Sequence, residues 1–349
     1  MTPYILLVLV ILIFYKFKIH SSLTLALLIF FSSVRYGIGW DYFSYFATSR
    51  TIRDAELERY GYLWQFLFEI GSKFNNEYVV IWVSALLTNL IFYVGIRKIF
   101  NKNEDKIYLS LITYVLYYSF YLSTFSTLRQ GLAVSFMPLL VYYCTQKRYW
   151  KTAIVNILMI MAHPSAIIVS VLWIPYLVFI KKITYKLLFA ISIGIVLSVK
   201  YLPSIVTLLF GTSYNSYFEI QNTFGGKIIY ANIVILIFVL FRVNHIRSKL
   251  PFYSPYFNLY LISAIIGIFF RLTQSNDIIA RILKYGDIML CVVLFNLISS
   301  ESKYYKIAKE IIIIFLVFLF LSYLNVVSGT KGTGGACYVP YKTIFDLNY

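Results

Sequence analysis

Hydrophobic residues run along this chain in stretches of roughly 15 to 20, and short polar segments separate them. A helix of that length spans the hydrocarbon core of a bilayer, so each stretch predicts a membrane-spanning helix. We place about twelve of them, with a range of about 10 to 14, near residues 3–15, 20–34, 78–96, 107–123, 128–145, 151–163, 165–180, 184–199, 228–241, 256–271, 281–299 and 310–326. Several stretches are short for a bilayer, which favours tilted or broken helices. The pattern predicts an all-α polytopic membrane protein.

The composition agrees with the hydrophobic pattern. Of the 349 residues, 60% are hydrophobic and only 13% are charged, whereas about 25% of a soluble domain is charged. No room is left for a separate soluble domain, so residues 1–326 are expected to form a single transmembrane helical domain, with a tail at 327–349. The first hydrophobic stretch lacks a basic leader and a small-residue cleavage site, so we interpret it as a retained helix.

The net charge of +17 raises the question of a nucleic-acid partner. The basic residues, however, gather in alternate connections, as the positive-inside rule predicts for cytoplasmic loops. These clusters are Lys16 and Lys18; Arg97, Lys98, Lys102 and Lys106; Lys147, Arg148 and Lys151; Lys181, Lys182 and Lys186; Arg242, Arg247 and Lys249; and Lys303, Lys306 and Lys309. The distribution predicts membrane lipid as a partner, no nucleic acid, and both termini on the outer face.

The connections on the predicted outer face are the long ones, at residues 35–77 and 200–227. Charged residues at i, i+3 and i, i+4 spacing predict a solvated helix over 48–59. The stretch at 61–71 is too short to span a bilayer, so it predicts an interfacial or re-entrant helix. Glycines in GTKGTGG predict that the outer tail, 327–349, is mobile.

Polar side chains gather at the predicted outer ends of the spans, and the first group lies in RYGIGWDYFSY, residues 35–45. Polar residues at such depth are costly to place and are functional candidates. A helical turn at 41–45 would put Asp41 and Tyr45 on one face. Asp41 could then act as a general base or hold an arginine. The alternative is an ion pair between Arg35 and Asp41 that only shapes the loop.

The second group lies in STFSTLRQGLAVSF, residues 123–136, where Arg129 and Gln130 begin an apolar helix. The helix dipole disfavours a guanidinium at a helix N-terminus, so a bound anion would have to compensate. A diphosphate suits this position, because arginine offers a planar fork and the helix end offers unpaired N–H groups. The alternative is an arginine that snorkels to the membrane interface.

The third candidate is His163, which stands at a predicted outer boundary directly before Pro164. A histidine there could move a proton or hydrogen-bond a phosphate. The alternative is a histidine that only caps a turn and takes no part in chemistry.

The fourth group lies in FRLTQSNDIIARILKYGD, residues 270–287. Arg271 closes one predicted span, and Asp277, Arg281 and Tyr285 share a helical face at i, i+4 and i+8. The alternative is a surface ion pair between Asp277 and Arg281.

Several signatures are missing from the sequence. The three cysteines have no disulfide or metal-ligand spacing, and there is no acidic DxD cluster, Walker motif or Gly-x-Ser-x-Gly elbow. Nucleotide sugars and ATP are therefore not expected as direct substrates, and we expect no metal and no cofactor. Arginines, a histidine, an aspartate and tyrosines at the outer leaflet suit a lipid that carries a diphosphate and a sugar chain.

Five segments, in this order, resemble the EpsG family of Wzy-type polymerases of O-antigen or capsular polysaccharide. They are RYGIGWDYFSY (35–45), ERYGYLWQFLFEIG (58–71), LRQGLAVSF (128–136), AHPSAII (162–168) and ARILKYGD (280–287). The resemblance implies a bacterial, multi-pass protein of the cytoplasmic membrane with a GT-C-like architecture. It implies a metal-independent glycosyltransferase whose site lies on the outer face. The enzyme would transfer a growing glycan from undecaprenyl diphosphate to the non-reducing-end sugar of a lipid-linked repeat unit.

Carried over residue by residue, the resemblance assigns roles to the candidate residues. Asp41, His163 and Arg35 match catalytic positions, and the resemblance leaves open whether Asp41 or His163 is the general base. The substrate-binding residues are Arg129, Gln130, Arg281, Tyr285, Arg271, Tyr42, Tyr45 and Glu58. The substrates are undecaprenyl diphosphate-linked oligosaccharides, and a chain-length regulator protein is a partner that such an enzyme could have.

Two other functions fit the same residues. A flippase or transporter of lipid-linked oligosaccharide also needs a cationic cavity, but it should carry polar residues through the membrane and on both sides. A ligase that moves finished glycan onto an acceptor, as for O-antigen, would have nearly the same site. The products separate the three, because loss of a polymerase leaves one repeat on the final acceptor, loss of a ligase leaves none, and loss of a flippase strands the repeat inside.

Overall fold

The computed structural model describes residues 1–50, 60–118, 120–179, 194, 201, 204, 207, 226–242, 251–273, 277–298, 304–328, 331–332, 335–336 and 338–346. Their regular structure is helical except for one antiparallel pair of two-residue strands, β1 (Lys331–Gly332) and β2 (Gly335–Ala336). The all-α prediction is therefore confirmed for these residues. The chain forms two compact units, Met1–Ile167 with Ile298–Tyr349, and Ile168–Leu297. The single domain expected over 1–326 stays a prediction.

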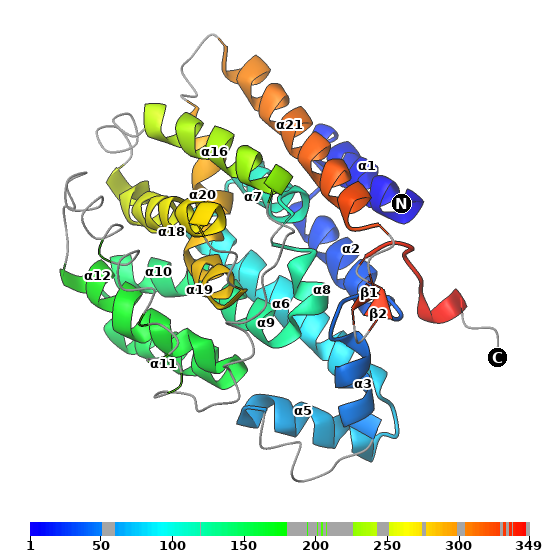
Figure 1. The fold of residues 1–349 in the computed structure, drawn as a ribbon. Coiled ribbons are helices and arrows are strands. Elements are labelled where there is room, and N and C mark those ends of the chain that lie inside the picture. The colour runs from blue at the N-terminus through cyan, green and yellow to red at the C-terminus, as the bar shows by residue number, and fades with distance from the viewer. Residues whose placement is uncertain are drawn as a thin grey trace. The chain divides into compact units, whose positions relative to one another are not determined.

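The first unit is built around α6 (Tyr78–Ile99), which packs against helices from before and after it in the chain (Figure 1). Its other helices are α1 (Thr2–Lys16), α2 (Ser21–Ser33), α3 (Tyr42–Arg50), α5 (Tyr62–Lys73), α7 (Glu104–Leu116), α8 (Ser123–Ser126), α9 (Leu128–Ser135), α10 (Met137–Thr145), α11 (Tyr149–Ala162) and α21 (Tyr305–Val326), with the short 3₁₀ turns η1 (Pro164–Ala166) and η8 (Ile344–Asp346). The ends follow local rules. The Asn103 side chain accepts the Lys106 N–H at the start of α7. Two acidic residues in the first turn interact favourably with the helix dipole.

The predicted spans correspond to apolar helices of different lengths. Two of the described helices, α6 and α21, are long and apolar enough to cross a membrane. Shorter apolar helices occupy Thr2–Lys16, Ser21–Ser33, Tyr149–Ala162, Pro164–Val178, Tyr230–Phe241 and Ser254–Ile268. The span expected at 184–199 lies outside the described residues except for residue 194. The number of spans and the GT-C-like architecture stay predictions.

Within the described residues, the predicted spans at 128–145 and 281–299 are not continuous α-helices, which corrects the sequence interpretation. The stretch at 128–145 is divided between α9 and α10, and Pro138 lies in the first turn of α10, where its missing N–H is tolerated. The stretch at 281–299 is divided among α19 (Asp277–Asp287), α20 (Leu290–Val293) and the 3₁₀ turn η7 (Leu294–Leu297). An apolar run alone does not reveal such breaks, because every piece remains hydrophobic.

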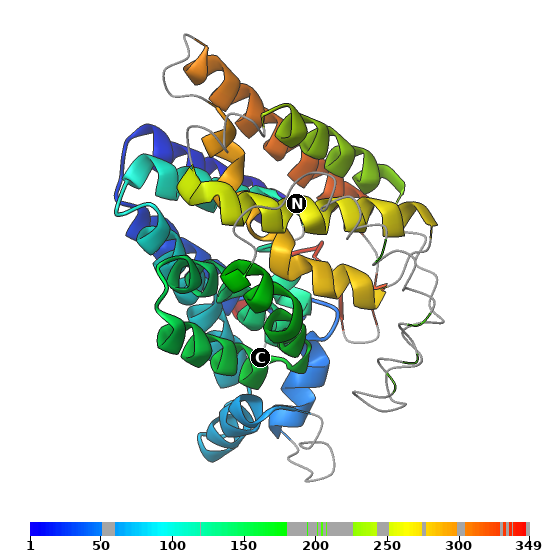
Figure 2. The same ribbon diagram turned by 90° about the vertical axis from the view of Figure 1, so that its left-hand side faces the viewer.

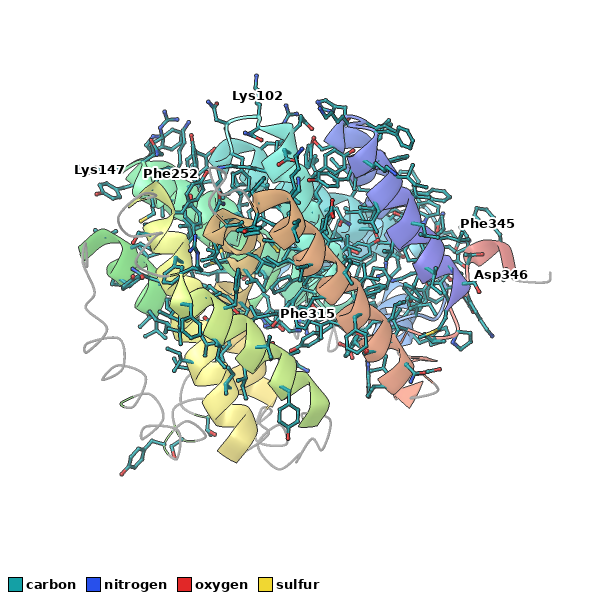
Figure 3. The ribbon with its side chains drawn as sticks, turned by 90° about the horizontal axis from the view of Figure 1, so that it is seen from above. Lys102, Lys147, Phe252, Phe315, Phe345 and Asp346 are labelled. Atoms are coloured by element: carbon teal, nitrogen blue, oxygen red, sulfur yellow. The ribbon has the colours of Figure 1, made fainter. Side chains whose placement is uncertain are left out.

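Residues predicted to face the cytoplasm meet at one end of the first unit. Glu104 Oε1 lies 3.3 Å from His20 Nε2, and Asp105 Oδ1 accepts a hydrogen bond from Tyr15 and lies 3.7 Å from Lys309 Nζ. These contacts join the end of α1, the start of α2 and the starts of α7 and α21. Figure 3 shows Lys102 and Lys147 toward one edge, apart from Phe345 and Asp346. Which end faces the cytoplasm stays a prediction.

The second unit contains the π-helical turn η2 (Val169–Trp173), the 3₁₀ turn η6 (Pro251–Tyr253), and the helices α12 (Ile174–Phe179), α16 (Gly226–Phe241), α18 (Ser254–Thr273), α19 and α20. Helices α18 and α19 lie side by side in both ribbon views (Figure 1 and Figure 2). Their approach is close at Gly286, where an added Cβ would collide with the Ser263 hydroxyl and lie 2.9 Å from the Leu259 carbonyl oxygen.

The end of the chain corrects another expectation. The tail was predicted to be mobile, but residues 338–346 pack against the first unit. Their backbone pairs with the segment after α2, since the Tyr36 N–H donates to the Lys342 carbonyl and the Ile344 N–H donates to the Val34 carbonyl, each at 2.9 Å. Tyr338 is buried. The glycines that suggested mobility lie before this segment, so their effect does not extend to it.

Candidate functional site

Arg35 is one of the most deeply buried polar residues among those described, with 1% of its surface exposed. Its guanidinium donates to carbonyls of its own segment, from Nη1 to Ser32 and from Nε to Ile38 at 3.3 Å. The guanidinium carbon lies 4.6 Å from the centroid of the Phe125 ring, a cation–π contact. Because the Ser32 carbonyl belongs to the last turn of α2, Arg35 closes the C-terminal end of that helix, where a positive charge is favoured.

Burial also affects the charge of Arg35. Desolvation lowers the pKa of Arg35, and the tyrosines around it, led by Tyr42, act in the opposite direction. An arginine stays protonated even so. The Tyr42 hydroxyl donates to the Arg35 carbonyl at 3.2 Å. Arg35 and Tyr42 therefore brace the loop that precedes α3.

Asp41 does not pair with Arg35. Its side chain is exposed at the start of α3, whereas that of Arg35 is buried, so the ion pair considered from the sequence is not formed. The Asp41 carbonyl accepts the Tyr45 N–H at 3.1 Å, which confirms the predicted helical turn. A carboxylate directly before the first residue of a helix is favoured by the dipole. Asp41 is thus placed where solvent can reach it.

A close contact joins the loop before α3 to the turn before α9. Gly39 has φ +111°, and a Cβ there would collide with the Phe125 carbonyl oxygen, so only glycine fits. Next to it, the Trp40 N–H donates to Ser126 Oγ at 3.2 Å. The loop that carries Asp41 is therefore fixed against the turn that leads to Arg129.

Arg129 lies in the first turn of α9, as predicted, and two tyrosines hold its guanidinium. Arg129 Nε donates to the Tyr45 hydroxyl oxygen at 3.3 Å. The guanidinium carbon lies 4.6 Å from the centroid of the Tyr60 ring. The side chain is half-buried and directed to these partners by α3 and by the residue that precedes α5. The neighbouring Gln130 is buried.

Tyr45 connects the charged groups of this region. Burial raises the pKa of Tyr45, the Arg129 guanidinium acts in the opposite direction, and the Asp41 carboxylate adds to the increase. The charges of Asp41 and Arg129 therefore both act on Tyr45, so the two charged side chains lie near the same tyrosine. A phenol with a raised pKa remains protonated near neutral pH, so it can also donate a hydrogen bond.

An aromatic cluster supports this neighbourhood. The Tyr45 ring lies 6.1 Å from Tyr60, 5.7 Å from Trp64 and 6.5 Å from Phe68, centroid to centroid. Trp64 is fully buried, and its Nε1 donates to the Ala162 carbonyl at 2.8 Å. The cluster thereby ties α5 to the last residue of α11. The helix predicted at 61–71 is confirmed as α5, and its interfacial position stays a prediction.

His163 follows Ala162 and begins a 3₁₀ turn. Its Nδ1 accepts the Ser165 N–H at 3.1 Å and lies 2.7 Å from the Ser165 hydroxyl oxygen. A nitrogen that accepts an N–H carries no proton, so a neutral His163 has its proton on Nε2. In this arrangement the ring is a hydrogen-bond donor at Nε2. It also caps the turn, as the alternative from the sequence expected.

The remaining candidates lie in the second unit, except for Glu58, and some of their side chains are not described. Arg281 is half-buried and Tyr285 is buried on α19, and the helix confirms their i, i+4 spacing. Arg271 lies on α18 and Asp277 begins α19, but their side chains are outside the described ones, as is the whole of Glu58. The structure therefore brings together Arg35, Asp41, Tyr42, Tyr45, Arg129 and Gln130 in the first unit, with His163 linked to them through Trp64.

The sequence interpretation missed three contributors to this region. Tyr60 and Trp64 lie in a segment that was quoted only for its family resemblance, and the aromatic residues around the start of an amphipathic helix were the available signal. The third is the segment 338–346, whose run of tyrosines around Pro340 could have marked it as packed. Within the part of the chain that the structure describes, no three His, Cys, Asp or Glu side chains are grouped to hold a metal ion.

The two helices that are long and apolar enough to cross a membrane, with the shorter apolar helices, are consistent with a helical membrane protein. The model of the EpsG family matches residues 18–343. The chain belongs to this family, which is associated with exopolysaccharide biosynthesis and Wzy-type polymerases. The resemblance drawn from the five sequence segments is confirmed. Comparisons with curated proteins and with solved structures find no match.

Proposed function

We propose that the protein is a polysaccharide repeat-unit polymerase of a bacterial cytoplasmic membrane. It transfers a growing glycan from undecaprenyl diphosphate to the non-reducing-end sugar of a lipid-linked repeat unit, without a metal ion. The site opens to the outer face of a multi-pass helical bundle. Membership of the EpsG family supports this assignment. The observation that carries it is Arg129, held between Tyr45 and Tyr60 beside the exposed Asp41.

The donor diphosphate binds at Arg129. The hydrogen bond from Nε to Tyr45 and the contact with the Tyr60 ring orient the guanidinium, which would meet phosphate oxygens as a planar fork. Charge develops on the diphosphate as it leaves, so a cation already in place stabilises the transition state without moving. His163, as a donor at Nε2, adds a hydrogen bond to the same anion.

The acceptor hydroxyl is deprotonated at Asp41. Its oxygen attacks the anomeric carbon of the donor sugar, the bond from that carbon to the diphosphate oxygen breaks, and undecaprenyl diphosphate leaves. The proton moves to the Asp41 carboxylate. Asp41 suits this step because it is exposed, acidic and near Arg129. Arg35 acts by positioning, since it is buried and occupied with the end of α2.

The other predicted binding residues complete the assignment. Arg281 and Tyr285 are retained as binding residues on the family resemblance, and Gln130 supports Arg129 from the next position of α9. Tyr42 holds the loop. Arg271 and Glu58 are retained as binding residues on the family resemblance.

Reconstitution tests the proposal. Purified protein is incubated with a defined undecaprenyl diphosphate repeat unit, and the products are separated by length. The wild type should form a ladder, and Arg129→Ala should reduce ladder formation by about 100-fold. Arg148→Ala, an exposed arginine of the predicted cytoplasmic end, is the matched control and should leave the ladder unchanged. A wild type that moves the lipid across vesicles without lengthening the glycan, or that only transfers it to another acceptor, overturns the proposal in favour of a flippase or a ligase.

A further inference from the structure

We propose that residues 338–346, the C-terminal strap, position the proposed site, and that the Tyr338 hydroxyl is the positioning group. The inference rests on the proposed function only for its catalytic consequence. The strap lies within the first unit, together with the segments that carry Asp41 and Arg129.

The strap is attached along its whole described length. The Tyr4 hydroxyl donates to the Tyr338 carbonyl at 2.8 Å, and the Tyr341 hydroxyl donates to the Phe31 carbonyl. The Tyr341 and Phe31 rings stack at 4.3 Å. Arg35 and Thr343 form an antiparallel bridge. The strap therefore fixes the end of α2 and the start of the loop that leads to Asp41.

The decisive contact runs through Ser126. The Tyr338 hydroxyl lies 3.2 Å from Ser126 Oγ, and that same oxygen accepts the Trp40 N–H at 3.2 Å. The Ser126 hydroxyl thus joins three segments that are far apart in the sequence. Trp40 directly precedes Asp41, and Ser126 lies in the turn before Arg129.

This chain of contacts sets the separation between the two proposed reacting groups. The close approach of Gly39 to the Phe125 carbonyl fixes the backbone just before Trp40. The hydrogen bond to Ser126 Oγ fixes the Trp40 N–H. Without the Tyr338 hydroxyl, Ser126 Oγ can rotate away from the Trp40 N–H, so the Asp41 loop loses its fixed distance from Arg129. Small displacements of a positioned group reduce turnover by up to about 100-fold. Diphosphate binding at Arg129 should not change, because Tyr45 and Tyr60 still hold that side chain.

The first test does not depend on activity. Hydrogen exchange of the peptide that contains Trp40 is compared in the wild type, Tyr338→Phe and Ser126→Ala, with Tyr149→Phe as an exposed control at the other end of α11. Tyr338→Phe and Ser126→Ala should exchange faster at this peptide, and Tyr149→Phe should not. Unchanged exchange in Tyr338→Phe overturns the strap, whatever the enzyme does.

The second test measures the catalytic consequence. Tyr338→Phe should reduce ladder formation by about tenfold to 100-fold, while binding of undecaprenyl diphosphate and the thermal midpoint stay at wild-type values. The double variant Tyr338→Phe/Ser126→Ala should be no worse than either single variant, because both act through one contact. Losses that multiply, or an equal loss of binding, overturn the positioning role. A wild type without polymerase activity would contradict the proposed function. The exchange experiment would still show whether the strap positions the loop at Trp40.

Discussion

Arg129 Nε and the Tyr45 hydroxyl oxygen lie 3.3 Å apart although 84 positions separate the two residues in the chain. The contact joins the first turn of α9 to α3 and fixes the direction of a half-buried guanidinium. The Tyr60 ring also contacts this guanidinium, with its centroid 4.6 Å from the guanidinium carbon.

Tyr45→Phe should weaken binding of undecaprenyl diphosphate by about tenfold. The change removes the acceptor of the Arg129 Nε–H and keeps the ring in the aromatic cluster, and a hydrogen bond to a charged group contributes about 1.5 kcal/mol. Binding to the purified variant in detergent is the measurement. Tyr36→Phe, in the loop before α3, is the matched control, since no hydrogen bond of its hydroxyl is found among the described residues. Equal affinity of Tyr45→Phe and wild type would contradict the role of this contact.

Arg35→Ala should destabilise the fold rather than affect binding alone. The change leaves the buried carbonyls of Ser32 and Ile38 without their donor, which costs about 2–3 kcal/mol. The yield of monodisperse protein and its thermal midpoint should fall, and Arg35→Lys should recover only part of the loss because lysine lacks the fork. Arg129→Ala, compared in parallel, should keep its midpoint. If Arg35→Ala keeps a wild-type midpoint and only activity is lost, Arg35 contacts substrate directly.

Local patterns predicted the parts of this protein that depend on near neighbours. The first turn of α9 at Arg129, the turn from Asp41 to Tyr45 and the helix through Arg281 follow from helical spacing and apolar runs. In each case the controlling interactions lie within a few residues.

Long-range contacts could not be predicted in the same way. The Tyr341 hydroxyl reaches a carbonyl 310 positions away, and no spacing in the sequence encodes such a contact. For the same reason the sequence did not predict the contacts of Arg35 with the end of α2 and with the Phe125 ring. The break in the stretch 128–145 was also missed, because both pieces of the divided helix remain hydrophobic.

Gly39→Ala should lower the free energy of unfolding by about 2–4 kcal/mol. Alanine is strained at φ +111°, and its Cβ would collide with the Phe125 carbonyl oxygen. The thermal midpoint in detergent is the measurement. Gly194→Ala is the control, because a Cβ there meets no atom within 4 Å. A midpoint for Gly39→Ala that equals that of the control would show that the two loops can separate freely.

The attachment of the strap should weaken at low pH. Asp346 Oδ2 accepts hydrogen bonds from the Thr343 N–H at 2.6 Å and from the Thr343 hydroxyl at 2.8 Å, and these bonds hold the pKa of Asp346 below its usual range. Because the folded-state pKa is lowered, the stabilisation is complete above the unfolded value of about 3.9 and is lost as the pH falls through the folded-state value. Hydrogen exchange of the strap peptide should therefore be slower in wild type than in Asp346→Asn above that range. The difference should vanish on acidification, and a difference that persists at the lowest pH would contradict the assignment.

His163→Asn separates the two roles that the geometry allows. Asparagine can accept the Ser165 N–H through its side-chain oxygen and so keeps the cap, but it offers nothing at the place of Nε2. We expect the thermal midpoint to stay near that of the wild type while ladder formation falls by about 100-fold, because the donor to the diphosphate is lost. His163→Gln reverses the pattern, since its longer side chain reaches toward Nε2 but leaves the turn uncapped, which costs about 1 kcal/mol of stability. A full ladder from His163→Asn together with a lowered midpoint for His163→Gln would mean that the histidine only caps the turn, and the diphosphate would then depend on arginines alone.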